Sequence, residues 1–156
     1  MVIESAIRLC LDLSYEAFKK GEVPIACVIL KDGNPIASAH NRVEELKDPT
    51  AHAELLAIRQ ACERLGSKYL HGCEAYVSLE PCPMCAYAFV LARVERVVFL
   101  AQDERYGAVM SLYNFFEEPR FNHRVRWEYY PVEEAKGLLR EFFRLRRANP
   151  SENLQR

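Results

Sequence analysis

The sequence has no long hydrophobic run. Its longest apolar stretches, such as residues 86–92, fall far short of the roughly 20 residues that a membrane-spanning helix requires. The first residues carry Glu4 within an amphipathic pattern, and they lack the basic region and the cleavage site of a secretory signal. We therefore expect a protein without a membrane span that resides in the cytoplasm.

The chain also lacks a strong net charge and an excess of glycine or proline. Its 156 residues include 21 basic and 22 acidic side chains, 6 glycines and 8 prolines, and half of them are hydrophobic. Disordered, collagen-like and coiled-coil chains have other compositions. A chain of this length commonly forms one domain, with a core that needs no disulfide framework. We expect residues 1–156 to form a single domain.

Clustered cysteines are scarce. Of six cysteines, only Cys82 and Cys85 lie close together in the sequence. In a cytosolic chain such a pair favours metal binding or catalysis over a disulfide. The remaining cysteines occur singly in apolar surroundings and are expected to be small buried hydrophobic residues. They are Cys10, Cys27, Cys62 and Cys73.

The near-zero net charge hides an asymmetry along the chain. Residues 1–119 carry 12 basic and 17 acidic side chains, whereas residues 120–156 carry 9 and 5. Four of these basic side chains, Arg140, Arg144, Arg146 and Arg147, lie on the charged face of a helix expected over about 132–148. This face could meet a polyanion, or it could be the ordinary solvated face of an amphipathic helix.

Strands and helices alternate in the middle of the chain. Apolar periodicity and helix breakers predict helices over 3–20, from about Thr50 to Gly66, from Pro81 or Pro83 to about Ala92, and from about Val132. Apolar runs bounded by turn residues predict strands over 24–30, 35–40, 74–79 and 94–101. No element is assigned between Gly107 and Val132. The alternation is typical of α/β layering, with helices packed on a sheet.

Two short motifs carry the chemistry. His52-Ala53-Glu54 precedes Pro81-Cys82-Pro83-Met84-Cys85, and both are expected at helix N-termini, where partial positive charge stabilises thiolates. Two thiolates and one imidazole suit zinc. A fourth ligand among His40, His71, His123 and Cys73 would make the site structural. Without one, an open position can hold a water, and Glu54 could act as general acid and base on it.

The same motifs allow less specific interpretations. Cys82 and Cys85 could be a redox pair or part of a structural zinc knuckle. Glu54 could be a buried, hydrogen-bonded carboxylate without a role. The proline between the cysteines and the nearby histidine make the redox pair the weaker alternative, and the two motifs together favour a catalytic zinc site.

The pattern His-x-Glu followed by Pro-Cys-x-x-Cys resembles the signature of the zinc-dependent nucleobase deaminases. Further segments narrow the resemblance to the bacterial tRNA-specific adenosine deaminases, over nearly the whole chain through about Arg147. These segments are Gly21-Glu22-Val23-Pro24, His40-Asn41-Arg42, Asp48-Pro49-Thr50, Leu79-Glu80-Pro81-Cys82, Asn122-His123-Arg124-Val125 and Phe142-Phe143-Arg144-Leu145-Arg146-Arg147.

This resemblance implies a cytidine-deaminase-like, three-layer α/β fold with a central mixed sheet of about five strands and helices on both faces. It also implies a homodimer with one Zn²⁺ per chain. The implied reaction is hydrolytic conversion of the wobble adenosine in a tRNA anticodon stem-loop to inosine. In that reaction zinc-bound hydroxide would attack adenine C6, and Glu54 would protonate N1 and later, with a second proton, the departing ammonia.

The resemblance also assigns residues by position. His52, Cys82 and Cys85 correspond to the zinc ligands and Glu54 to the proton shuttle. Asn41 corresponds to the asparagine that holds the purine and Ile25 to an apolar wall of the base pocket. Ala53, Asp103 and Ser111 are further candidates for substrate contact. Candidates for the RNA backbone are Arg105, Arg144, Arg146 and Arg147.

The chain departs from the family pattern at several positions. Ala26 and Cys27 follow the Val-Pro-Ile segment where the family commonly has glycine first, and Tyr106 is bulkier than the usual residue in a segment that continues through Met110. These departures concern pocket clearance and RNA contacts rather than the chemistry. The aromatic residues Tyr113, Phe115, Phe116 and Phe121 could serve core or dimer packing, or base stacking.

Two other functions remain open at this level. A deaminase of the same superfamily could act on free guanine, cytosine or a cytidine nucleotide, although the C-terminal arginines argue against it. A non-catalytic, zinc-stabilised binding module is the second alternative. Glu54 argues against that module, because a structural zinc site needs no carboxylate beside an open position.

Overall fold

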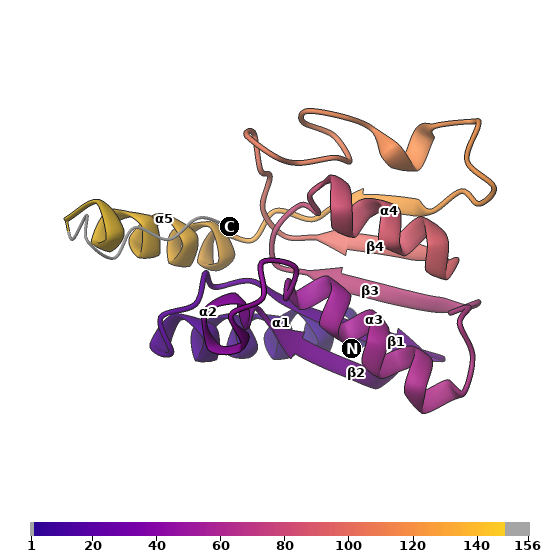
Figure 1. Cartoon of the computed structure of the whole chain (residues 1–156), viewed down its shortest axis with the longest axis horizontal. Helices are drawn as coiled ribbons and strands as arrows, with labels where there is room; N and C mark the ends of the chain where they lie inside the picture. Colours follow the sequence, from indigo (N-terminus) through magenta and orange to yellow (C-terminus); the bar gives the residue numbers. More distant parts are fainter. Residues whose placement is uncertain (1, 149–156) are drawn as a thin grey trace.

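A mixed sheet of five strands organises the structure, a computed structural model that describes residues 2–148 (Figure 1). The spatial order of the strands is β2-β1-β3-β4-β5. The strands are β1 (Ala26–Lys31), β2 (Asn34–His40), β3 (Cys73–Val77), β4 (Arg96–Phe99) and β5 (Arg126–Tyr129). Strand β1 pairs antiparallel with both β2 and β3, whereas β3, β4 and β5 run parallel.

Turn chemistry and chain crossovers explain this topology. Asp32 and Gly33 link β1 to β2 with φ values of 51° and 77°, the left-handed pair that a tight hairpin turn requires. Parallel strands need a longer crossover. Between β3 and β4 that crossover contains α4 (Pro83–Ala92), which begins with the proline that suits a first helical turn.

Helices cover both faces of the sheet. In Figure 1, α3 (Ala53–Leu65) and α4 lie in front of the sheet and α1 (Val2–Lys19) lies behind it. Helix α5 (Glu133–Ala148) packs beside α1, where the rings of Phe18 and Phe142 meet edge to face at 6.0 Å. An ion pair of 2.7 Å between Arg8 and Glu134 also joins them. The expected three-layer α/β fold is confirmed.

The core lies around the three central strands. Strand β1 is buried along nearly its whole length, and the inner residues of β3 and β4 are buried too. Strands covered on both faces are hydrophobic without alternation, which explains the continuous apolar run before the hairpin. Within residues 2–148 we find no helix that is both long and apolar enough to cross a membrane.

Three short elements were not assigned from the sequence, one of them the 3₁₀ helix η1 (Phe115–Glu117). Strand β5 is only partly buried and is fixed by its partner, because Arg96 on β4 forms ion pairs with Glu74 on β3 and Glu128 on β5. Helix α2 (Val43–Leu46) has four residues, too few for a periodic signal. The terminal helix expected over about 132–148 is confirmed as α5.

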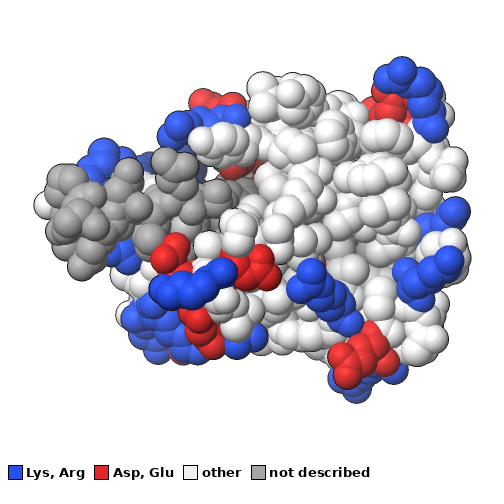
Figure 2. Space-filling model, viewed as in Figure 1, with Lys and Arg blue, Asp and Glu red and all other residues white. Residues whose placement is uncertain are grey.

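The surface over α4 is poor in charge. Figure 2 shows a broad uncharged area there, in the view of Figure 1. Several of the exposed large hydrophobic residues belong to α4 and to the loop that follows β4. They are Tyr87, Leu91, Met110, Leu112 and Tyr113.

Candidate metal centre and active site

Three metal-ligating side chains converge where α3 and α4 begin. His52 is the residue before α3, Cys82 is the residue before α4, and Cys85 lies in the first turn of α4. All three are buried. The expectation that both motifs lie at helix N-termini is therefore confirmed. There, the partial positive charge of the helix ends favours ionised thiols.

The spacing of these ligand atoms fits a zinc ion. Zinc binds sulfur at about 2.3 Å and imidazole nitrogen at about 2.05 Å, so tetrahedral angles require a sulfur–nitrogen separation of roughly 3.6 Å. His52 Nδ1 lies 3.6 Å from Cys82 Sγ and 3.5 Å from Cys85 Sγ. Both sulfur–nitrogen separations therefore match those of a zinc ion held by the three residues.

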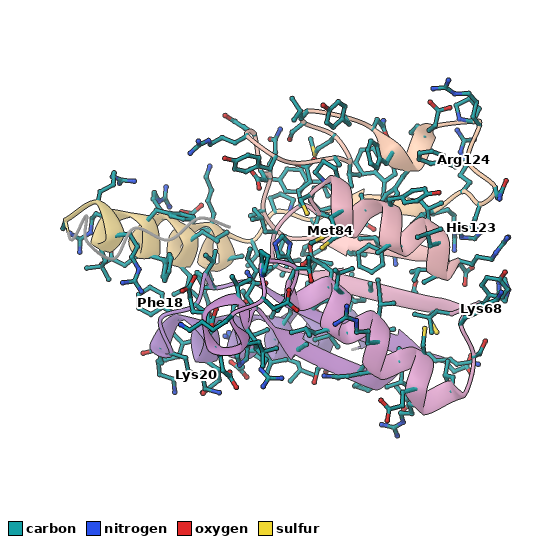
Figure 3. The ribbon with its side chains drawn as sticks, in the orientation of Figure 1. Phe18, Lys20, Lys68, Met84, His123 and Arg124 are labelled. Carbon is teal, nitrogen blue, oxygen red and sulfur yellow. The ribbon has the colours of Figure 1, made fainter. Side chains whose placement is uncertain are left out.

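No fourth protein ligand joins this group within residues 2–148. His52, Cys82 and Cys85 are the one set of three or more potential ligand residues found there with all ligand atoms within 4.8 Å of one another. The ring nitrogens of two suggested fourth ligands face backbone oxygens instead: His40 Nδ1 lies 2.7 Å from its neighbour's carbonyl, and His123 Nε2 lies 2.7 Å from that of Val94. Figure 3 also shows His123 far from Met84, which lies between the two cysteines in sequence.

Glu54 is the acidic residue of the first turn of α3, and its side chain has no exposed surface. It is two residues from His52 but is not part of the ligand set. Proximity to Glu54 and burial together raise the pKa of the Cys27 thiol, with burial the larger cause. The arrangement provides one buried carboxylate beside a three-ligand site, as a proton shuttle requires.

Asn41 links the candidate base pocket to the metal-site helix. Its backbone N–H donates to the carbonyl of Ile25 at 3.0 Å, and its side-chain Oδ1 accepts a hydrogen bond of 2.8 Å from the N–H of Ala53. Ile25, Asn41 and Ala53 are all buried. The structure thus brings three of the predicted substrate residues together next to His52 and Glu54.

The N-terminus of α3 is formed differently from the sequence-based expectation. Thr50 was expected to introduce this helix, but its N–H and hydroxyl both donate to Asp48 Oδ1, at 2.8 and 2.7 Å. These bonds lower the pKa of the Asp48 carboxyl. The helix begins at Ala53, and the first N–H is satisfied by Asn41 instead. Because Asn41 provides this hydrogen bond, the side chain of His52 does not cap the helix and can bind the metal.

A buried carboxylate holds the segment that follows Asn41. The oxygens of Glu22 accept hydrogen bonds from the N–H groups of Glu44 and Glu45 at 3.0 and 2.8 Å, at the start of α2. A carboxylate at a helix N-terminus satisfies free donors and complements the helix dipole. Nothing in the segment Gly21-Glu22-Val23-Pro24 itself indicates this function of Glu22.

A second buried carboxylate organises the loop after β4. Glu80 accepts hydrogen bonds from the N–H groups of Asp103, Val109, Met110 and Ser111, and from the Ser111 hydroxyl at 2.6 Å. Asp103 and Ser111, predicted as substrate contacts, therefore belong to one network around Glu80. That network fixes the loop beside Cys82, because Ala108 N–H also donates to the carbonyl of Pro81 at 2.8 Å.

Gly107 is required by this network. A Cβ added there would lie 2.2 Å from the Glu80 carboxyl carbon, whereas one added at Gly137 in α5 meets only the end of Arg140, at 3.9 Å. We expect Gly107→Ala to destabilise the protein by roughly 1–3 kcal/mol or more, because a packed site must shift. Thermal unfolding measures this change. Gly137→Ala is the control and should be neutral or stabilising; equal melting temperatures for the two variants would contradict the packing argument.

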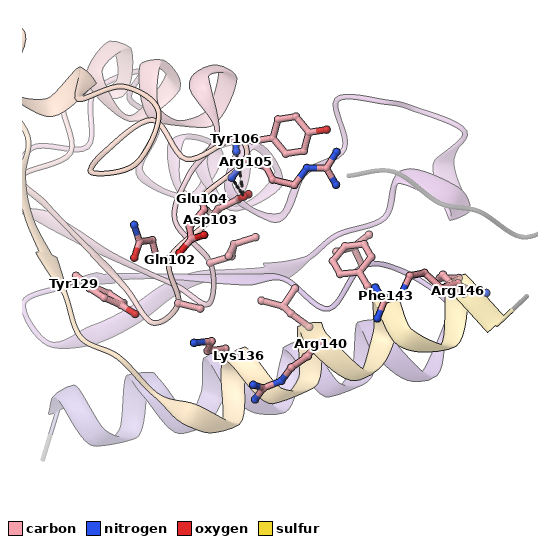
Figure 4. Close-up of a pocket in the computed structure, with 15 residues that line it drawn as sticks. Gln102, Asp103, Glu104, Arg105, Tyr106, Tyr129, Lys136, Arg140, Phe143 and Arg146 are labelled. Carbon is pink, nitrogen blue, oxygen red and sulfur yellow. Dashed lines mark hydrogen bonds between the residues drawn. The ribbon is translucent and has the colours of Figure 1, made fainter. Parts of the chain in front are cut away.

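A cleft of about 840 Å³ separates the loop after β4 from α5 (Figure 4). Its walls reach Leu79 and Val23, close in sequence to Cys82 and Ile25. Among the predicted RNA contacts, the cleft is lined by Asp103, Arg105, Arg146 and Arg147. Its lining carries more basic than acidic side chains: Arg105, Lys136, Arg140, Arg146 and Arg147 against Asp103 and Glu104.

Two predicted contacts stand apart from this cleft lining. Arg144 is not among the residues that line the cleft, and it forms an ion pair of 2.7 Å with Glu141. Ser111 does not line it either, since its hydroxyl is bonded to Glu80. Arg146 lines the cleft but also donates to the carbonyl of Gly21 at 3.3 Å and lies over the ring of Phe142, so it helps to dock α5.

The isolated cysteines behave largely as expected. Cys10, Cys27 and Cys73 are buried, whereas Cys62 is only half-buried. Burial raises the pKa of each of these four thiols. They therefore stay protonated at neutral pH and pack as neutral side chains.

Comparisons with known proteins agree with this site. The sequence profile of the cytidine and deoxycytidylate deaminase zinc-binding region matches residues 2–101, which include His52, Glu54 and both cysteines. A tRNA-specific adenosine deaminase of Aquifex aeolicus is 58% identical over 146 residues, covering 94% of this chain and 97% of that protein.

Solved structures give the same picture. One from a study of A-to-I editing by tRNA:A34 deaminases at the wobble position of transfer RNA is 42% identical, with a TM-score of 0.84 over 87% of this chain and 99% of that one. A guanine deaminase from Bacillus subtilis is 32% identical, with a TM-score of 0.62 over 90% and 93% of the two chains. The chain therefore belongs to the cytidine and deoxycytidylate deaminase family, and within it groups with the proteins named tRNA-specific adenosine deaminases.

Proposed function

We propose that this chain is a zinc-dependent hydrolase that converts the wobble adenosine of a tRNA anticodon stem-loop to inosine. The observation that carries the proposal is the set of His52, Cys82 and Cys85 without a fourth protein ligand among residues 2–148, next to buried Glu54. The similarity to tRNA-specific adenosine deaminases supports the choice of substrate. We further infer that the chain forms a single deaminase domain and works in the cytoplasm.

Each group in the site has a defined task in this proposal. His52, Cys82 and Cys85 hold zinc, which when bound lowers the pKa of a coordinated water to about 7 and so supplies a nucleophile at neutral pH. The hydrolysis needs two proton transfers: Glu54 would first carry one from water to adenine N1, and then a second from the new C6 hydroxyl to the amino group that leaves as ammonia. Ile25 supplies an apolar wall that replaces the stacking lost when the base leaves the loop.

Asn41 is suited to orient the purine. Its Oδ1 is already bonded to the N–H of Ala53, while no group within residues 2–148 accepts a hydrogen bond from its Nδ2. The amide nitrogen can therefore donate to an acceptor atom of the purine, as asparagine commonly does with adenine. The hydrogen bond to Ala53 therefore fixes the position of the amide before substrate binds.

We predict that Asn41→Asp separates these two tasks. The aspartate keeps an oxygen for Ala53 at the start of α3, where negative charge is favourable, but it removes the donor that meets the purine. An unpaired buried acceptor costs roughly 1–3 kcal/mol, so kcat/KM should fall about 10- to 100-fold at an unchanged melting temperature. Asn34→Asp, at the exposed first residue of β2, is the control. Wild-type kcat/KM in Asn41→Asp would refute the donor role.

The cleft beside α5 is the proposed path of the RNA backbone. Arg147 lines it and forms no ion pair within the described part of the chain, whereas Arg144 is paired with Glu141 and lies outside the cleft lining. We predict that Arg147→Ala weakens tRNA binding and lowers the slope of log affinity against log salt by about 0.7–0.9, the loss of one phosphate contact.

Fluorescence anisotropy with labelled tRNA at several salt concentrations measures this effect. The matched variant Arg144→Ala should bind as the wild type does. If both variants lose tRNA affinity equally, or neither loses any, a position in the cleft lining does not decide which of these arginines binds RNA.

We propose that the chain forms a homodimer through the uncharged surface over α4. Leu91 is 59% exposed and Tyr87 is 41% exposed. An apolar groove between α4 and the loop that follows β4 is lined by Met84, Phe115 and Phe121. Contiguous exposed apolar surface of this kind marks protein–protein contact. Light scattering should give twice the chain mass, and Leu91→Arg should shift it toward one chain.

The substrate is tested by parallel assays of ammonia release. Purified protein is incubated with a tRNA transcript that carries a wobble adenosine, with free adenosine, with guanine and with cytidine. We expect release from the tRNA alone. Turnover of guanine with the tRNA untouched would keep the metal centre and give the chain the activity named for the Bacillus subtilis structure.

A further inference from the structure

Tyr106 is an exposed aromatic residue on the rim of the cleft. It is 45% exposed and lines the cleft opposite α5, which contributes Phe143 (Figure 4). Arg147 of α5 also lines the cleft. We propose that the ring of Tyr106 stacks on an unpaired base of the tRNA anticodon loop, next to the nucleotide that is deaminated. This ring is called the stacking platform below. This inference rests on the proposed function and names a subsite within it.

The ring is presented by a rigid segment. The N–H groups of Arg105 and Tyr106 both donate to Asp103 Oδ1 at 3.1 Å, and the N–H of Gly107 donates to the Asp103 carbonyl at 2.9 Å. Glu80 fixes both ends of the loop through Asp103 and Ser111. A preformed platform loses little conformational entropy when a base binds.

The chemistry around the ring suits a nucleotide. The Arg105 guanidinium lies 5.3 Å from the centre of the Tyr106 ring, and within residues 2–148 no other aromatic ring contacts it. Single-stranded RNA is bound by aromatic faces that stack on bases and by arginines that meet phosphates. Tyr106 and Arg105 offer both on adjacent residues.

The subsite is also next to the candidate active site. The loop is tied to the segment before Cys82, since Glu80 N–H donates to the Ala101 carbonyl at 2.8 Å and Ala108 N–H donates to the Pro81 carbonyl at 2.8 Å. The cleft volume of about 840 Å³ is within the range of pockets that bury a whole ligand. A base held by Tyr106 therefore flanks the nucleotide whose base enters the pocket of Ile25 and Asn41.

A close control exists elsewhere on the surface. Tyr15 on α1 is 53% exposed and has Lys19 Nζ 5.2 Å from the centre of its ring, as Tyr106 has Arg105. Tyr15 does not line the cleft. Tyr106→Ala and Tyr15→Ala therefore each remove an exposed tyrosine beside a cation. Only Tyr106→Ala also removes the proposed platform.

The test couples the tyrosine to one base. Anticodon stem-loop RNAs with a wobble adenosine are prepared intact and with an abasic nucleotide at each other loop position in turn. We expect Tyr106→Ala to lower kcat/KM on the intact RNA on the order of 10- to 100-fold, the effect of losing one base–aromatic stack. Tyr106→Phe and Tyr15→Ala should retain wild-type values. At one flanking position the abasic RNA should impair the wild type but not impair Tyr106→Ala further.

The outcomes separate the two proposals. Wild-type inosine formation with fully additive effects of Tyr106→Ala at every abasic position would overturn the stacking proposal alone, as would unchanged kcat/KM in Tyr106→Ala. No inosine from the wild-type protein on the intact stem-loop would overturn the proposed function together with this subsite.

Discussion

Replacing Glu54 with glutamine is expected to abolish most turnover while zinc stays bound. Glu54 is fully buried in the first turn of α3 but is not part of the three-residue ligand set. The amide has nearly the same shape and cannot accept the proton, so kcat should fall by roughly 10²- to 10⁴-fold, the usual contribution of a general acid and base. Inosine formation, zinc per chain and thermal unfolding measure the three parts of this prediction.

The matched control for Glu54 lies on the same helix. Glu63 is exposed on α3, so Glu63→Gln removes one charge from this helix without touching the site and should leave kcat unchanged. Undiminished deamination by Glu54→Gln would disprove the proton-shuttle assignment. Loss of zinc from that variant would instead make Glu54 part of the metal site.

Replacement of any one of the three ligands is expected to remove the metal. His52→Ala, Cys82→Ala or Cys85→Ala leaves two ligands at a site that has no fourth protein ligand within residues 2–148. Zinc affinity should fall more than the roughly 100-fold that loss of a residue behind a ligand produces. Metal analysis of the purified variants should therefore find far less zinc per chain, with activity lost in proportion.

Cysteines outside the cluster provide the comparison. Cys62→Ala removes a half-buried thiol whose pKa is raised by burial, and it should keep the wild-type zinc content. Full zinc retention in all three ligand variants would contradict the ligand set. If only one of the three variants retains its zinc, the residue replaced in that variant is not a ligand.

The metal centre was predictable from the sequence because each of its parts is local. His52 and Glu54 are two residues apart, Cys82 and Cys85 are three apart, and each pair begins a helix. The central strands were predictable for a similar reason, since a buried strand is a continuous apolar run. Only the direct meeting of the two motifs in space required the fold.

Long-range polar contacts were not predictable. Glu22 and Glu80 each satisfy N–H groups more than 20 residues away, and nothing in their own segments indicates the partner. The same limit explains why Thr50 was expected to introduce α3 when Asn41 provides the hydrogen bond. It also explains the arginines of α5, since spacing alone did not separate Arg147, which lines the cleft, from Arg144, which does not.

The proposed reaction is the deamination of one adenosine of a tRNA at this site. The most direct measurement is sequencing of a tRNA transcript with a wobble adenosine after incubation with the wild-type protein or with Glu54→Gln, because inosine is copied as guanosine. We expect conversion at the wobble position alone, and by the wild type alone. An unconverted wobble position in a tRNA treated with zinc-loaded wild-type protein, or equal conversion by both proteins, would contradict it.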